Sequence, residues 1–212
     1  MLKELIDGIF WDIALIVFLA GIVWNLLAVF TRGIKKDLAV PRGSGLVGAV
    51  MTNVRRFYPH HEIAPQIRFQ VVSGYLFHVG LLVLLFFARP HVEFVKDISG
   101  VGWTPVPDWI FNLAYEIAFA GLLLLLLYRL LSPVTRLISR TDSYVGSILV
   151  LLVMFSGCLA MLESFEGLRL FHRFMVELLM IYFPFSSLMH AFLFIPSRGY
   201  SGAMFGRRGV DI

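Results

Sequence analysis

The sequence contains little charge. Asp, Glu, Lys and Arg make up 15% of the 212 residues, whereas hydrophobic residues make up 58% and the mean hydropathy is +0.82. A soluble domain of this length does not need so much apolar surface, so the composition indicates a polytopic membrane protein with one bundle and no soluble domain. The charged residues fall in clusters between apolar runs. The pI near 9.4 therefore reflects membrane orientation rather than nucleic-acid binding.

Cysteine is almost absent, because the single one, Cys158, lies inside an apolar run. One cysteine excludes a disulfide framework and an iron–sulfur ligand set within this chain. The C-x-x-C-H motif of covalent haem attachment is also missing. The N-terminus lacks a basic n-region and a small-residue cleavage site, so we expect its first apolar run to be retained as a membrane helix.

Five apolar runs reach the length of about 20 residues that a helix needs to cross a bilayer. The sequence therefore predicts an all-α fold, in which a bundle of five transmembrane helices forms a single integral-membrane domain over residues 1–212. It contains no internal repeat. The predicted helices lie at about 9–30, 70–89, 108–131, 144–162 and 170–195, with Pro90 stopping the second and Pro196 following the fifth.

The basic residues are distributed unequally between the two predicted sides of the membrane. Cytoplasmic loops are enriched in Lys and Arg, and 13 of the 18 basic residues fall on one side. We therefore expect the N-terminus outside and the C-terminus in the cytoplasm. The 13 are Arg32, Lys35, Lys36, Arg42, Arg55, Arg56, Arg68, Arg129, Arg136, Arg140, Arg198, Arg207 and Arg208.

The first predicted loop contains the stretch GLVGAVMTNVRRFY (45–58), which has helical apolar spacing and a basic face. A helix of this kind could lie in the cytoplasmic interface of the membrane or form a docking surface for a partner. An amphipathic loop helix that only anchors the bundle is equally consistent with the pattern.

Four histidines lie at matching depths on the second and fifth predicted helices. His172 and His190 are 18 residues apart, or five helical turns, so both rings should point from one face, about 27 Å apart along the axis. His78 lies near the depth of His190, and His91 near that of His172. Paired imidazoles from facing helices at two depths hold two b-type haems, so the pattern predicts transmembrane electron transfer. A buried histidine can instead be a packed, hydrogen-bonded group.

The pairing of His91 with His172 has a geometric difficulty. Thirteen residues separate His78 from His91, which places them about 220° apart on an ideal helix and therefore on nearly opposite faces. Pro90 can break the helix and let His91 turn back. If it does not, His172 lacks a partner and the chain binds one haem.

Other ionisable residues each have two interpretations. Glu116 and Glu177 are intramembrane carboxyls that carry protons or stay neutral and hydrogen-bonded. His60 and His61 lie in the basic loop, and we expect them to be solvated. Several arginines near the depths of haem propionates suit carboxylates through their planar fork, but they can equally anchor helices at the interface. These arginines are Arg68, Arg89, Arg169 and Arg173.

The segments GYLFHVGLLVLL (74–85) and RLFHRFMVELLMIYFPFSSLMHAFLFIP (169–196) carry an FPFS-x-L-x-H stretch and the 18-residue histidine spacing. They resemble the membrane cytochrome b (gamma) subunit of respiratory nitrate reductase and the related cytochromes of sulfite-reduction and heterodisulfide-reductase-like complexes. The resemblance covers five helices in order and orientation, but only two of them by motif.

The resemblance implies two b haems and electron exchange with menaquinone or ubiquinone. It also implies an iron–sulfur subunit and a catalytic subunit on the cytoplasmic face of a prokaryotic inner membrane. By motif, His78 and His190 match the ligands of the cytoplasm-side haem, and His172 matches a ligand of the outer haem.

The sequence departs from the family at the remaining ligand. The family has that histidine ten residues after the first one, where this chain has Ala88, and His91 is the nearby substitute. This departure puts the outer haem in doubt or moves its ligand. The family's quinone pocket adjoins the outer haem, and Lys96 in the loop after the second helix could contact a quinone oxygen.

We therefore expect an electron-transfer subunit of a quinol-linked oxidoreductase complex, with no substrate-reduction site of its own and no nucleic-acid partner. One alternative is a haemless membrane anchor, which has no need for matched histidines. The other is a small proton-coupled transporter that uses Glu116, Glu177 and the histidines as a relay. Such a transporter often shows an internal repeat, which this sequence lacks.

Overall fold

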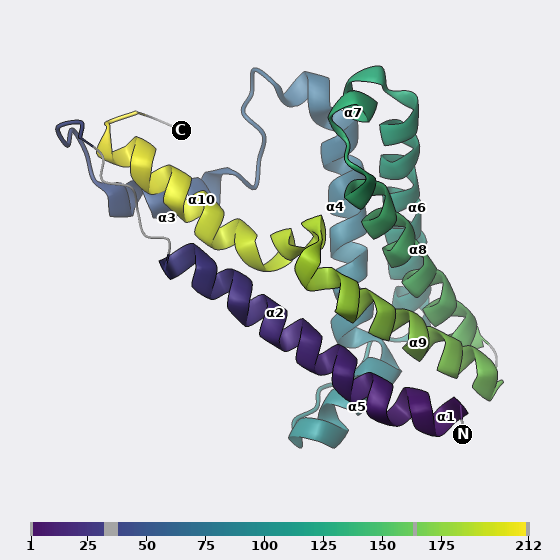
Figure 1. Cartoon of the computed structure of the whole chain (residues 1–212). Helices are drawn as coiled ribbons and strands as arrows, with labels where there is room; N and C mark the ends of the chain where they lie inside the picture. The colour runs from purple at the N-terminus through teal and green to yellow at the C-terminus, as the bar shows by residue number, and fades with distance from the viewer. Residues whose placement is uncertain (1, 32–37, 163–164, 211–212) are drawn as a thin grey trace. The chain divides into compact units, whose positions relative to one another are not determined.

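The computed structural model describes residues 2–31, 38–162 and 165–210 (Figure 1). Every regular element in these ranges is a helix, which confirms the all-α prediction. The chain divides into two compact units, and the single-domain expectation stays a prediction. Unit 1 comprises Met1–Pro65 and Glu177–Ile212, and unit 2 comprises Gln66–Val176. Three basic residues used to predict orientation, Arg32, Lys35 and Lys36, lie outside the described residues.

Four helices of the described chain are long and apolar enough to cross a membrane, and a bent pair adds a fifth if it counts as one span. These four helices and the bent pair overlap the five predicted segments. The break in the bent pair lies inside the predicted range of the fifth segment, 170–195. The first follows a short start, α1 (Leu2–Leu5) and η1 (Ile6–Phe10). The four are α2 (Trp11–Thr31) with that start, α4 (Ala64–Phe87), α6 (Asp108–Leu131) and α8 (Thr141–Leu162).

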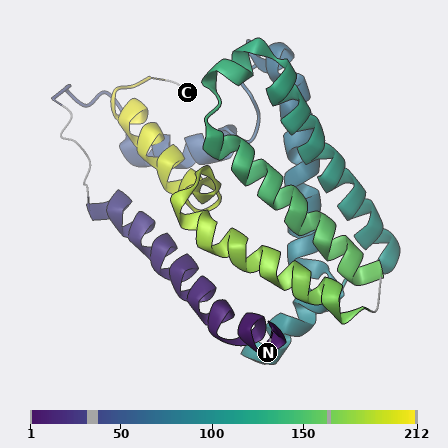
Figure 2. The ribbon, with the colours of Figure 1, turned by 45° about the vertical axis from the view of Figure 1, so that its right-hand side comes forward.

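In unit 2, α4, α6 and α8 run side by side, and α7 (Pro133–Ile138) joins α6 to α8 (Figure 2). Glycines let α4 and α6 approach closely. A Cβ atom on Gly80 would lie 2.7 Å from the Cβ of Ala118, and one on Gly121 would lie 2.7 Å from the backbone nitrogen of Phe77. Small residues of this kind are typical of helix contacts in membranes, where close backbone packing replaces the hydrophobic driving force.

The second predicted helix breaks at the proline, as the sequence suggested. Helix α4 ends at Phe87, and Ala88 has an extended backbone with φ −64° and ψ 135°. A new helix, α5 (Arg89–Ser99), begins there with Pro90 in its first turn. Proline lacks an N–H and its ring clashes with the preceding turn, so α4 cannot continue through it. The residues that follow are therefore free to point in a new direction.

In unit 1, α3 (Gly45–Arg55) packs against α10 (His190–Arg207), and this contact is also made by glycines. A Cβ atom on Gly206 would lie 2.7 Å from the Cα of Gly48, and one on Gly202 would clash with Thr52 Oγ1. The stretch 45–58 therefore does form a helix over most of its length, with its small residues turned to α10.

The fifth predicted segment, 170–195, is broken rather than continuous. Its two halves meet at an angle of 80°, and the second half continues past Pro196 instead of ending before it. The prediction that His172 and His190 lie on one straight helix, five turns apart, is therefore wrong. The elements in order are α9 (Glu166–Tyr182), η2 (Phe183–Phe185), η3 (Ser187–Met189) and α10.

Pro184 and Ser186 explain the break. Proline in a helix interior removes one hydrogen bond and clashes with the preceding turn. Ser186 is extended, with φ −117° and ψ 170°, and its Oγ donates to the carbonyl of Phe183 at 2.9 Å and accepts from the backbone nitrogen of Leu188 at 3.2 Å. Asn25 of α2 donates through Nδ2 to the carbonyl of Pro184 at 3.1 Å. The break thus finds its hydrogen-bond partners within the protein, as a membrane requires.

Candidate functional site

His91 of α5 and His172 of α9 face one another within unit 2. Their ring centroids are 6.4 Å apart, and the ring planes differ by 18°. Two metal–nitrogen bonds of about 2 Å, with a ring radius of about 1 Å on each side, put the centroids of two imidazoles on one metal roughly 6 Å apart. The spacing therefore admits one metal ion between the two rings.

The break at Ala88 turns His91 back toward the end of α4, so the offset expected for an unbroken helix does not apply. His91 Nδ1 lies 2.9 Å from the carbonyl oxygen of Leu84 and 3.1 Å from that of Leu85. These carbonyls belong to the last turn of α4, which lacks a full set of helical donors. Because a carbonyl only accepts, Nδ1 carries the proton and the lone pair of the neutral ring is on Nε2.

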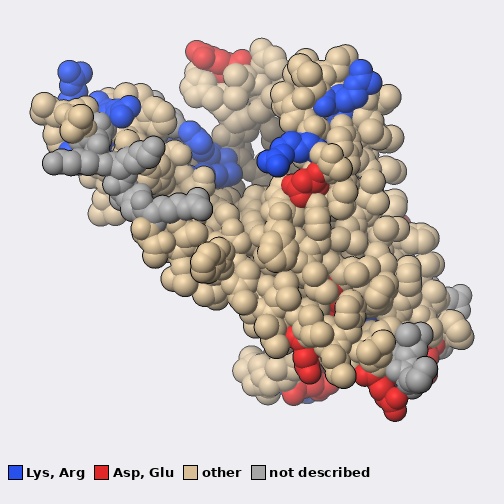
Figure 3. Space-filling view, viewed as in Figure 1, with Lys and Arg blue, Asp and Glu red and all other residues tan. Residues whose placement is uncertain are grey.

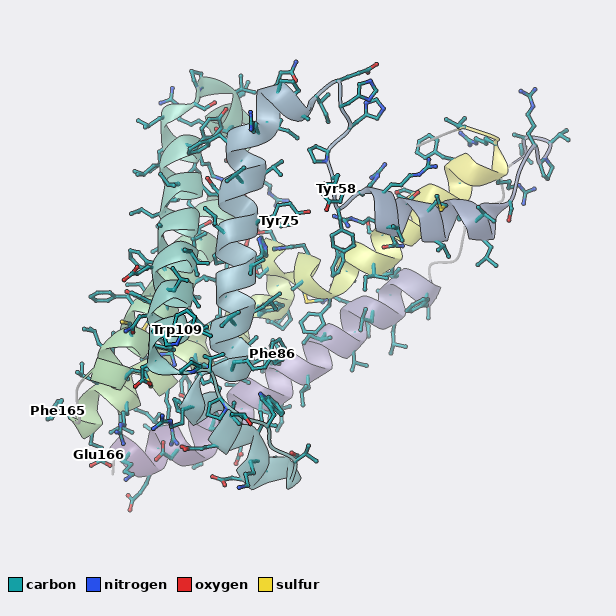
Figure 4. The ribbon with its side chains drawn as sticks, turned by 180° about the vertical axis from the view of Figure 1, so that it is seen from behind. Tyr58, Tyr75, Phe86, Trp109, Phe165 and Glu166 are labelled. Carbon is teal, nitrogen blue, oxygen red and sulfur yellow. The ribbon has the colours of Figure 1, made fainter. Side chains whose placement is uncertain are left out.

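One more side chain donates a hydrogen bond to a carbonyl at the C-terminal end of α4. Trp103 donates through Nε1 to the carbonyl of Phe86 at 2.7 Å, and Phe86 lies at the lower end of α4 (Figure 4). Together with His91, the indole adds donors to carbonyls of the last turn of α4, where Leu84 also accepts from the backbone nitrogen of Ala88. The carbonyls at the end of α4 therefore hold the ring of His91 in its position.

Ser156 and Gly157 of α8 fix the ring of His172. Ser156 Oγ donates to the carbonyl of Val153 at 3.0 Å and lies 3.1 Å from His172 Nδ1. Since its only proton is used toward Val153, the hydroxyl accepts from Nδ1–H, and Nε2 again keeps the lone pair. Ser156 is fully buried, and a Cβ atom on Gly157 would lie only 2.9 Å from His172 Cε1. Neither residue could be predicted as part of the site, because a Ser-Gly pair in an apolar run matches no motif.

His78 and His190 have the same arrangement in separate units. His78 Nδ1 lies 2.7 Å from the carbonyl oxygen of Gly74, and His190 Nδ1 lies 2.8 Å from that of Ser187. Both partners only accept, so these two rings also carry the proton on Nδ1. Because His78 belongs to unit 2 and His190 to unit 1, their pairing stays a prediction.

All four predicted ligands therefore present the form in which histidine binds a metal through Nε2. Metal-ligating histidines almost always donate the other ring N–H to a carbonyl, carboxylate or water, which fixes the tautomer and the ring orientation. The FPFSSLMH stretch positions the ring of His190, because the break at Pro184 brings the Ser187 carbonyl next to His190 Nδ1. Within unit 2, the spacing of His91 and His172 fits a b haem held by two imidazoles.

The other predicted residues have no comparable arrangement. Lys96 lies five residues after His91, about 140° further around α5. A Cβ atom on Gly102 would lie 3.1 Å from Lys96 Cγ, so the methylene chain of the lysine packs on that glycine. Glu177 is fully buried and Glu116 is exposed. A quinone contact for Lys96 and proton-carrying roles for the two glutamates stay predictions.

His60 and His61 are exposed, as predicted, at the end of the loop before α4. With Glu62 they form a cluster whose ligand atoms lie within 4.8 Å of one another, and His60 Nδ1 is 3.9 Å from Glu62 Oε2. Exposed polar groups commonly lie this close without an ion, so we assign no metal to this cluster.

Basic side chains gather at particular ends of the helices. Lys and Arg cover the ends of α3 and α10 in unit 1, and they also cluster around α7 in unit 2 (Figure 3). The exposed basic residues at these places include Arg42 and Arg207 in unit 1 and Arg136 and Arg140 in unit 2.

Comparison with known proteins adds one distant relative. The chain is similar to a protein of Nitratidesulfovibrio vulgaris (strain Hildenborough) whose description is only "Protein", with 28% identity over 190 residues that cover 87% of this chain and 80% of the relative. No protein-family model matches the chain. No solved structure matches it either.

Proposed function

We propose that the chain is a membrane cytochrome b, a subunit that exchanges electrons between the quinone pool and an iron–sulfur partner of a respiratory oxidoreductase complex. One observation carries the proposal. The imidazoles of His91 and His172 come from different helices, lie 6.4 Å apart and have Nδ1 bound by the protein, which leaves Nε2 for a metal. A haemless anchor would have no need for this arrangement.

Each histidine has a role in this proposal. His91 and His172 hold the outer haem, and His78 and His190 hold the inner one; if His91 is not a ligand, the chain carries one haem. A b haem bound between two imidazoles accepts and gives up single electrons. The carbonyls at the end of α4 and the hydroxyl of Ser156 keep the rings from rotating.

The orientation and the partners belong to the same proposal. The basic bias supports an N-terminus outside and a C-terminus in the cytoplasm of a prokaryotic cell with the chain in its inner membrane. An iron–sulfur subunit then docks on the basic segments 31–69 and 197–212, close to the inner haem. Menaquinone or ubiquinone reacts near the outer haem, where Lys96 could contact a quinone oxygen.

A difference spectrum of the purified protein tests the proposal. We expect the dithionite-reduced minus oxidised spectrum to show the bands of a b-type haem, and the pyridine haemochrome to give two haems per chain. A chain that is folded and helical but has no haem bands would be an anchor or a transporter. That result would refute the proposal that the chain is a cytochrome b.

A further inference from the structure

The guanidinium of Arg198 in α10 is a cation within unit 1 that has no acidic partner among the described residues. Its guanidinium carbon lies 5.3 Å from the ring centroid of Phe57 and 5.4 Å from that of Phe194. Among the described residues its Nη1 is buried without a hydrogen-bond partner, and no carboxylate forms an ion pair with it. An uncompensated charge in an apolar surrounding is costly, so the arrangement calls for an anion from outside the chain.

The guanidinium is directed toward His190. His190, Phe194 and Arg198 follow one another at intervals of four residues and therefore form one ridge along α10. Side chains of a helix lean toward its N-terminus, and the contact with Phe194 places the guanidinium one turn closer to His190 than its own Cα. The ring of Phe57, which follows α3, lies against the same guanidinium. Two aromatic faces thus hold the cation in one position.

The planar fork of a guanidinium matches a carboxylate, with which it forms two parallel hydrogen bonds. A haem carries two propionate carboxylates at one edge, several ångströms from its iron. Eight residues separate Arg198 from His190, a rise of about 12 Å that the backward lean of the arginine shortens. We propose that Arg198 binds a propionate of the haem whose iron His190 ligates. This inference rests on the proposed function and concerns an arginine outside the four that the sequence suggested for propionates.

A contact between Arg198 and a propionate would change the midpoint potential of the haem, which packing of the arginine against Phe57 and Phe194 alone would not do. A positive charge at the propionate favours the reduced iron, which carries one positive charge fewer than the oxidised iron. Removal of the charge should therefore lower the midpoint potential of that haem. The haem in question is identified as the one that His190→Ala removes.

The test measures this potential in the holoprotein of wild type, Arg198→Gln and Arg198→Lys. We expect Arg198→Gln to retain both haems but to lower the potential of the His190 haem alone, and Arg198→Lys to recover part of the shift. Arg140→Gln removes the same charge from an exposed position outside the proposed docking segments and should leave both potentials unchanged. Haem affinity is compared as well, because the guanidinium–carboxylate pair needs an ionised propionate. Arg198→Gln should bind haem more weakly than wild type does, and the two should bind haem dimethyl ester, whose propionates are neutral, equally well.

Two results would overturn the inference: an unchanged potential of the His190 haem in Arg198→Gln, or an affinity difference between wild type and Arg198→Gln that persists with the dimethyl ester. An unchanged potential together with loss of bound phospholipid would make the anion a lipid phosphate. If Arg198→Gln does not fold, Arg198→Lys carries the same comparison between haem and its ester. A wild-type protein without haem would instead refute the proposed function itself, which is a separate outcome.

Discussion

At the residue scale, four histidines share one hydrogen-bonding pattern although they lie in different local structures. His91 follows a helix break, His172 faces a serine on another helix, His78 bonds within its own helix and His190 caps a broken segment. In each case Nδ1 is bound and Nε2 carries the lone pair. The exposed His60 differs, because its Nδ1 lies 3.9 Å from the carboxylate oxygen Oε2 of Glu62. A shared chemical form across unlike surroundings indicates a shared use.

Ser156→Ala tests the residue scale. The change removes the acceptor of His172 Nδ1–H and leaves a buried donor without a partner. Loss of an outer partner of a metal ligand typically costs roughly 10- to 100-fold in metal affinity, so we expect weaker retention of the outer haem during purification. Haem content and midpoint potential are the measurements.

Ser147→Ala is the matched control, because its Oγ donates to a carbonyl one turn back on the same helix and contacts no histidine. It should retain haem as the wild type does. Equal haem retention in the two variants would mean that Ser156 does not hold the ligand.

At the element scale, proline breaks two helices and in both places positions a histidine. The break at Pro90 could be predicted, because the sequence offered a histidine that only a turned chain could bring to His172. The break at Pro184 could not be predicted, because apolar residues continue on both sides of the proline and have the pattern of one long membrane helix. Its hydrogen-bond partner Asn25 is 159 residues away along the chain, and such a partner has no local sequence signal.

The glycine contact between α3 and α10 gives a second prediction at this scale. A Cβ atom in Gly202→Ala would clash with Thr52 Oγ1 and with the carbonyl of Gly48. Overpacking of this kind should lower the free energy of unfolding by roughly 1–3 kcal/mol. Unfolding in detergent, followed by far-ultraviolet circular dichroism, measures the change.

Gly199→Ala is the control on the same helix, since its Cβ would lie at an ordinary 3.5 Å from Asn53 Nδ2. Its free energy of unfolding should stay within about 1 kcal/mol of the wild type. If both variants unfold alike, the α3–α10 contact is looser than described.

At the scale of the whole molecule, composition predicted a membrane protein, and the lengths and places of the apolar runs predicted the all-α class and the approximate positions of the helices. Helix α6 has the predicted bounds, 108–131, because Pro107 and Ser132 flank a continuous apolar run. The residues that hold the proposed ligands could not be predicted from the sequence, because Ser156 and Gly157 contact a histidine of another helix. Contacts between helices depend on the tertiary fold and have no period along the chain.

Orientation is testable in a Cys158→Ser background with single added cysteines. The basic bias predicts that Val210→Cys, near the C-terminus, resists a membrane-impermeant thiol reagent in intact cells and reacts after permeabilisation. Val101→Cys, which follows α5 and is 64% exposed, should react in intact cells. The reverse labelling pattern would invert the proposed topology and move the docking site of the iron–sulfur partner to the other face.

The central claim is that His91 and His172 hold one haem between them, and haem stoichiometry tests it most directly. Pyridine haemochrome content per chain should fall from two in the wild type to one in His91→Ala, in His172→Ala and in the double variant, with the same haem lost each time. Because both ligands serve one iron, the second substitution should remove nothing further. Two haems in His91→Ala, or loss of different haems in the two single variants, would contradict the account.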